Sequence, residues 1–125
     1  PERELIKELG IHAFSMRDLD HMGMTRLSNL AVELLGSDIS GIHLSFDIDV
    51  LDPEIAPGVS THAPGGMSFR EAHLALCILA ETGLVRSIDF VELNPAQDIR
   101  NKTAELTADL VKTALGHTIL PDKHS

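Results

Sequence analysis

Two aspartates separated by one residue, Asp47 and Asp49, stand inside a mostly apolar run over residues 41–51. If that run is a β-strand, alternate side chains point to the same face, so both carboxylates project together near its carboxyl end. Two like charges so close do not both ionise unless a cation lies between them. Hard divalent ions such as Mn²⁺ and Mg²⁺ meet that need with oxygen ligands. The spacing therefore predicts a metal site at this strand end.

A second interpretation of the aspartate pair needs no metal, because the two carboxylates could instead cap backbone amides in the turn after the strand. Burying an uncompensated charge among Phe46, Ile48 and Val50 is costly, which favours the metal interpretation. The spacing alone does not identify a reaction, since many phosphoryl and glycosyl transferases also carry two aspartates in this arrangement.

The composition limits the classes of function that we expect. Lys and Arg total 10 against 19 Asp and Glu, a net charge of −9, and Trp and Tyr are absent. Nucleic-acid binding is not expected, since it depends on basic residues for the phosphates and on aromatic residues for stacking. No apolar run approaches the roughly 20 residues needed to cross a bilayer, so we expect no membrane association. A single cysteine, Cys77, forbids an internal disulfide and fits a reducing cytoplasm.

Helical and strand patterns alternate around the aspartates. We expect helices over 2–9, 24–36, 68–82 and 103–115, and strands over 11–14, 41–51 and 85–93. Ser15 with Asp18, and Ser68 with Glu71, have the spacing of capping boxes. The alternation predicts an α/β fold with three layers, αβα, around a parallel sheet of three strands. The continuously apolar run 41–51 is expected to be covered on both faces, and ligands of such folds bind at the carboxyl ends of the strands.

A longer string of residues resembles a known superfamily. Residues 45–66, SFDIDVLDPEIAPGVSTHAPGG, resemble the C-terminal signature of the ureohydrolases, which include arginase, agmatinase and formimidoylglutamase. The likeness continues in the same order and spacing through SFRE at 68–71, DFVELNP at 89–95 and RNKTA at 100–104. The last two blocks are more similar to bacterial arginase than to agmatinase. The resemblance covers essentially the whole chain and implies the arginase-like fold.

The resemblance implies roles for four residues. Asp47 and Asp49 match two aspartate ligands of a dinuclear manganese centre, which holds two Mn²⁺ ions per active site. Glu92 matches the glutamate that binds the substrate guanidinium, a group whose parallel N–H bonds a carboxylate accepts in pairs. Thr61 matches the loop threonine near the metal-bound hydroxide. Without the resemblance, Glu92 is interpreted as a solvated acid at a strand end and Thr61 as an ordinary loop hydroxyl.

Several residues near these positions are not assigned to the site. Val50 stands where many members of the superfamily have glycine, and His62 stands where many have proline. We do not expect His62 to be a ligand, because a lone loop histidine is more often solvated. His43, on the strand face of the aspartates, is expected to be a hydrogen-bonded core residue. Asp52, before Pro53, is expected to form a turn.

The sequence lacks two further metal-ligand blocks of the superfamily, Gly-Gly-Asp-His and Asp-Ala-His-x-Asp. Residues 1–125 are therefore expected to be the C-terminal part of a longer catalytic domain whose upstream half is absent. The implied function is metal-dependent hydrolysis of L-arginine to L-ornithine and urea by the longer enzyme, with this part alone inactive. Agmatine or formimidoylglutamate as the substrate, and a non-catalytic truncated interaction domain, are the alternatives. The resemblance also implies a homo-oligomer.

Overall fold

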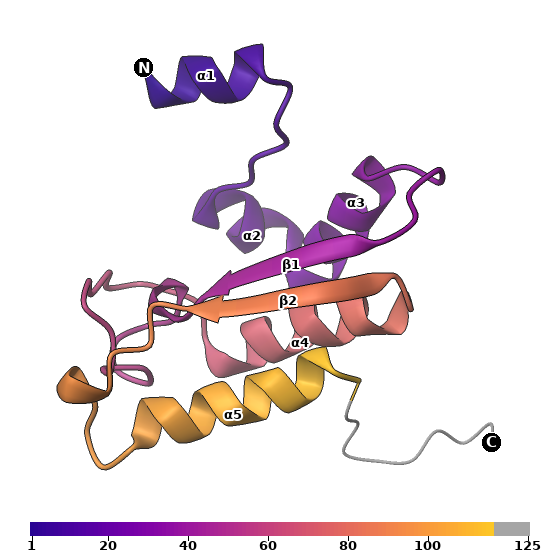
Figure 1. Ribbon diagram of the computed structural model, residues 1–125. Coiled ribbons are helices and arrows are strands. Elements are labelled where there is room, and N and C mark those ends of the chain that lie inside the picture. Colours follow the sequence, from indigo (N-terminus) through magenta and orange to yellow (C-terminus); the bar gives the residue numbers. More distant parts are fainter. Residues whose placement is uncertain (117–125) are drawn as a thin grey trace. The chain divides into compact units, whose positions relative to one another are not determined.

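The computed structural model describes residues 1–116 (Figure 1). These residues fall into two units, residues 1–39 and the residues from Ser40 onward, and each is described by itself. Among the described residues, none of the helices combines the length and the apolar character of a transmembrane segment.

The first unit consists of helices α1 (Glu2–Glu8), α2 (Met16–Met22) and α3 (Met24–Leu34). The predicted capping box begins α2, since the Ser15 hydroxyl accepts the backbone N–H of Asp18 and the Asp18 carboxylate accepts that of Ser15. The Ser15 hydroxyl also donates to this carboxylate, and these hydrogen bonds lower the pKa of Asp18. The helix therefore begins where its polar residues satisfy otherwise unpaired amides.

The segment over residues 11–14 differs from the prediction of a strand. The described residues contain two strands, and neither includes this segment. Ile11 and Phe14 are exposed, with 53% and 37% of their surface accessible. A strand is stable only when a neighbour pairs with its backbone and an apolar face is covered. Neither condition holds here, so the prediction of a three-stranded sheet is wrong for the described residues.

The second unit is a parallel two-stranded sheet with helices packed against it. It contains β1 (Ile42–Asp47), β2 (Val85–Val91), α4 (Phe69–Glu81), α5 (Lys102–Ala114) and the 3₁₀ turns η1 (Ile48–Val50) and η2 (Pro95–Gln97). Ser68 and Glu71 form the predicted capping box at the start of α4. Figure 1 shows α4 and α5 side by side on the same side of the two strands. Parallel strands need a crossover connection, and α4 lies on it.

One face of the sheet is covered within this unit and the other is open. The covered face packs with both helices into a core of Phe46, Ile48, Leu51, Ala56, Val59, Ala72, Leu76, Leu110 and Ala114. The alternate residues of β1, which are His43, Ser45 and Asp47, are exposed. The prediction that this strand is covered on both faces is therefore wrong for the described unit, because α4 and α5 form a single layer.

Asp98 holds the start of α5, and Thr103 fastens this start to the loop after β1. The Asp98 carboxylate accepts hydrogen bonds from the backbone N–H groups of three residues, Ile99, Thr103 and Ala104, at 2.8, 2.9 and 3.0 Å. The Thr103 hydroxyl accepts the backbone N–H of Gly58 at 2.8 Å. A Cβ at Gly58 would lie 2.8 Å from the Asp98 side chain, so only glycine fits there. Loop and helix therefore hold each other in one arrangement.

Hydrogen bonding keeps Asp98 ionised. Partial burial raises the pKa of its carboxyl, but hydrogen bonds from Thr103, Ala104 and Ile99 outweigh that effect and lower the pKa from 3.8 to about 2. A pKa that is lower in the folded state than in the unfolded state stabilises the fold above the unfolded value. This contribution is lost as the pH falls through the folded value.

We predict that Asp98→Asn lowers the free energy of unfolding at neutral pH, because the amide lacks the charge and one acceptor oxygen. The difference from the unsubstituted chain should narrow as the pH falls from about 4 to about 2, where the carboxylate loses its contribution. Urea unfolding, followed by circular dichroism at several pH values in this range, measures the difference in the free energy of unfolding. Asp109→Asn is the matched control, since that carboxylate makes only an exposed ion pair with Lys112. If the difference in unfolding free energy stays constant with pH, the ionised Asp98 carboxylate does not stabilise the fold as described.

Candidate active site

The two candidate metal ligands lie at the carboxyl end of β1 but not on one strand. The strand ends at Asp47, and Asp49 lies in η1. The backbone N–H of Leu51 donates to the Ile48 carbonyl at 3.1 Å, and Ile48 is 0% accessible, so the chain turns around a buried anchor. Asp47 is exposed and Asp49 is half-buried. The prediction that both aspartates lie on one buried strand is therefore wrong for Asp49, although both residues remain at the same strand end.

Neither of these aspartates caps the turn that follows. Asp47 is the N-cap residue of η1 but makes no side-chain cap hydrogen bond. Among residues 1–116, no hydrogen bond or ion pair reaches either carboxylate. Asp52 does form the predicted turn, since it accepts the backbone N–H groups of Glu54 and Gly65 at 2.9 and 3.0 Å. The oxygens of Asp47 and Asp49 therefore have no protein partner in the described chain and suit a cation.

The described residues do not by themselves form a complete metal site. Within residues 1–116, no group of three or more His, Cys, Asp or Glu side chains is arranged to hold a metal ion. Carboxylate oxygens are the ligands that Mn²⁺ and Mg²⁺ prefer, so the two unpartnered aspartates fit such an ion chemically. Because each ion takes about six ligands in octahedral geometry, a complete centre requires ligands from other residues.

Glu92 lies where the chain after β2 changes its backbone partner. Val91 pairs with Asp47 in the parallel ladder, whereas Leu93 forms an antiparallel bridge with Val59. Between them, Glu92 has a left-handed backbone with φ of 69° and an exposed side chain. That conformation costs a residue with a side chain roughly 1–2 kcal/mol, so the neighbouring contacts must hold it. The sequence predicted a strand as far as Leu93, but the strand ends before this turn.

Thr61 lies in the loop over residues 57–62, which is fixed before and after it. Val59 is 1% accessible and belongs to the core. The Nε2 of His62 lies 2.9 Å from the carbonyl oxygen of Pro57 and donates to it, which closes the loop. Thr61 itself is exposed. His62 therefore has a local structural contact, and Thr61 is presented between two fixed residues.

His43 lies on the open face of the sheet. Its Nδ1 is 2.7 Å from the Ser87 hydroxyl, and its Nε2 is 3.5 Å from the Asp89 carboxylate. The predicted hydrogen bonding is confirmed, but the predicted core location is wrong because His43 is exposed. The helices of this unit cover only the opposite face of the strand.

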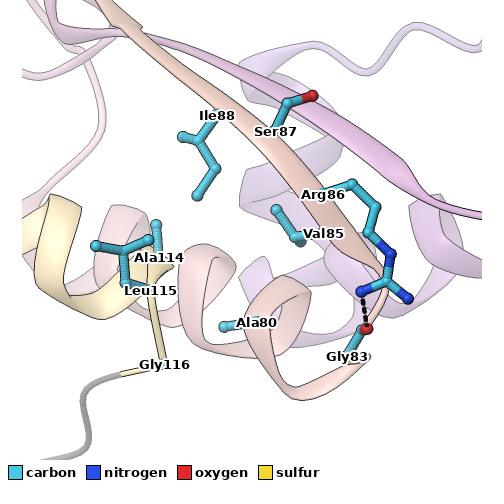
Figure 2. Close-up of a pocket in the computed structure, with 9 residues that line it drawn as sticks. All are labelled: Ala80, Gly83, Val85, Arg86, Ser87, Ile88, Ala114, Leu115 and Gly116. Carbon is cyan, nitrogen blue, oxygen red and sulfur yellow. Dashed lines mark hydrogen bonds between the residues drawn. The ribbon is translucent and has the colours of Figure 1, made fainter.

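A cavity of about 390 Å³ is lined by other residues, which Figure 2 shows as sticks. Its lining residues are Ala80, Gly83, Val85, Arg86, Ser87, Ile88, Ala114, Leu115 and Gly116. The first residue of β2 is among them, whereas Asp47 and Glu92 lie at the other ends of the strands. Ligands of parallel α/β folds bind at the carboxyl ends of the strands, so we do not assign this cavity to the site.

Comparison with known proteins identifies the family. The family model described as the arginase family matches residues 1–116. The chain belongs to the arginase family. It is 44% identical over 119 residues to the arginase of Bacillus subtilis (strain 168), a match that covers 95% of this chain and 40% of that protein.

Solved structures agree with this assignment. The native arginase of Bacillus caldovelox matches this arginase-family chain with a TM-score of 0.90 and 42% identity, over 95% of this chain and 40% of that one. The formimidoylglutamase of Bacillus subtilis matches with a TM-score of 0.84 and 26% identity, over 90% of this chain and 35% of that one. The predicted α/β, arginase-like fold and the predicted resemblance are confirmed. The chain spans about 40% of the length of the curated arginases that it matches.

We predict that Asp47→Ala or Asp49→Ala lowers manganese occupancy in a chimera that joins this chain to the part of the Bacillus subtilis arginase that it does not cover. Removing a ligand leaves an open coordination position, so Mn²⁺ affinity should fall on the order of tenfold or more. Metal analysis after dialysis measures the occupancy. Asp109→Ala, an exposed acid on α5, is the control. Full manganese stoichiometry in either site variant would show that the ligand assignment is wrong.

Proposed function

We propose that this chain forms the part of an arginase active site that carries two metal-ligand aspartates and the guanidinium-binding glutamate. The reaction is hydrolysis of L-arginine to L-ornithine and urea. The observation that carries the proposal is that carboxylates without a partner among residues 1–116 lie at one end of the sheet, where Asp47 pairs with Val91 and Glu92 follows. The arginases that match at 42–44% identity support arginine as the substrate.

Asp47 and Asp49 hold part of a dinuclear manganese centre in this proposal. When bound, Mn²⁺ supplies Lewis-acid chemistry that lowers the pKa of water and so makes it a nucleophile near neutral pH. The role of the two aspartates is to hold the ions at the end of β1, where η1 turns around Ile48. The net charge of −9 also favours the approach of a cationic substrate.

Glu92 and Thr61 bind and orient the substrate in this proposal. A guanidinium presents parallel N–H donors in a plane, and a carboxylate accepts two of them at once. Glu92 is exposed in the described chain, so its oxygens are accessible to such a group. The exposed hydroxyl of Thr61 both donates and accepts hydrogen bonds, which suits it to orient the reacting groups.

We further propose that the protein works as a homo-oligomer in the cytoplasm. Cys77 is a free cysteine, which fits a reducing compartment. In the second unit, the side chains of Ile99 and Leu115 are 60% and 74% exposed, and another subunit would cover them.

The experiment that tests the proposed function compares urea release by the isolated chain and by the chimera, both supplied with Mn²⁺. We predict release from L-arginine by the chimera and none by the isolated chain, because the described residues hold only part of the metal centre. Urea release by the isolated chain would show that the chain does not need further residues to complete its site. If the chimera releases urea from agmatine, or formamide from formimidoylglutamate, but no urea from arginine, the substrate assignment is wrong. A folded, metal-loaded chimera that is inactive on all three would favour a non-catalytic domain.

We predict that Glu92→Gln in the chimera spares the manganese and weakens substrate binding. The amide keeps the size of the side chain but loses the charge and one acceptor, so kcat/KM should fall roughly 30-fold, about 2 kcal/mol. Steady-state kinetics beside metal analysis measures both quantities. Glu105→Gln, an exposed acid on α5, is the control. An unchanged kcat/KM would show that Glu92 does not bind the substrate.

A further inference from the structure

Asn94 joins the end of β2 to the loop over residues 57–62. Its side-chain Nδ2 donates to the Ser60 hydroxyl at 2.9 Å, and its Oδ1 accepts the backbone N–H of Ala96 at 3.1 Å. Its own backbone N–H donates to the Gly58 carbonyl at 2.7 Å. The amide side chain therefore bridges two segments that are distant in the sequence, and the backbone contact beside it fixes the residue itself.

The left-handed backbone of Glu92 depends on anchors on either side. A residue with a side chain resists this conformation, because its Cβ crowds the backbone. Val91 holds the chain to β1 on one side, and Leu93 and Asn94 hold it to the loop on the other. The Asn94 side chain adds to the second anchor through Ser60, beside the backbone contacts of Leu93 and Asn94. Loosening this anchor would let Glu92 return to a more favourable backbone conformation, which would redirect its carboxylate.

The same contact sets the position of Thr61. Ser60 precedes it and is exposed, so the hydroxyl of Ser60 is held by Asn94 rather than by packing. Val59, in the core, fixes the part of the loop that precedes Ser60 and Thr61, and His62 closes the loop after them. Beyond Val59, where the backbone contacts of the loop with the strand end stop, the hydrogen bond from Asn94 to Ser60 ties the residue before Thr61 to the strand end.

We propose that Asn94, acting through Ser60, is a positioning residue that keeps the Glu92 carboxylate and the Thr61 hydroxyl in one fixed relation. It does so for a planar guanidinium substrate, and this part of the inference rests on the proposed function. The mechanical part, which concerns the backbone of Glu92 and the loop, rests on the hydrogen bonds alone.

The first test is nuclear magnetic resonance on the 125-residue chain and its variants. A left-handed φ brings the amide and α protons of one residue close together, so Glu92 should give a strong intraresidue Overhauser effect. We expect this signal to weaken, and the Thr61 amide resonance to move, in Asn94→Ala and Ser60→Ala. Ser60→Thr keeps a hydroxyl, so it should retain the strong Overhauser effect of Glu92 and the position of the Thr61 amide resonance. The control variant Gln97→Ala should retain them too. Unchanged signals in both alanine variants would overturn the proposal, and Ser60→Ala decides alone if Asn94→Ala does not fold.

The second test measures arginine kinetics and manganese content in the chimera. Losing one hydrogen bond should lower kcat/KM about tenfold in Asn94→Ala and Ser60→Ala, with a raised KM and unchanged manganese. Ser60→Thr should restore the kinetics. If the alanine variants instead lose manganese or fail to fold, with no rise in KM, Asn94 only supports the structure and the proposal is overturned. If the unsubstituted chimera hydrolyses no substrate, the proposed function fails, while the resonance measurement still decides whether Asn94 positions Glu92.

Discussion

The parallel pairing of β1 with β2 is the constraint on which the rest of the site depends. Its register sets Asp47 opposite Val91 at the last rung of the ladder. Beyond that rung both chains leave the sheet, since β1 turns into η1 and the chain after β2 turns toward the loop of Val59. Because both strands run in the same direction, their carboxyl ends coincide. Polar residues from three separate stretches of sequence therefore gather at one edge.

Buried apolar neighbours hold these exposed polar residues in place. Ile48 lies between the two aspartates and is 0% accessible, and Val59 lies just before the loop threonine and is 1% accessible. Burying a side chain of this size contributes roughly 1.5–3 kcal/mol, more than an exposed hydrogen bond supplies. The buried side chains thus fix the backbone from the core side, while the carboxylates of Asp47 and Glu92 remain accessible to solvent. A site built in this way needs little direct support for its own polar side chains.

Two features of the same edge work against local stability. Asp47 and Asp49 are near each other in the chain with no partner among the described residues, and Glu92 adopts an unfavourable backbone conformation. Like charges without a cation repel, and a left-handed backbone stores strain. Asp98 compensates nearby, because its hydrogen bonds at the start of α5 and the contact of Thr103 with the loop fasten the surrounding chain. Such unfavourable features are typical of residues kept for function.

The sequence by itself determined most of the helices and the family. Capping boxes and helical spacing predicted α4 correctly, and the blocks around Asp47 and Glu92 identified the family, because both signals depend on neighbouring residues. Only the tertiary structure decided where the strands end, which face is covered and which segments pair. An apolar run such as 41–51 has the same pattern whether it continues as a strand or turns around a buried Ile48. The contact between Asn94 and Ser60 has no local signal at all, since it joins residues 34 positions apart that meet only when the loop folds back onto the sheet.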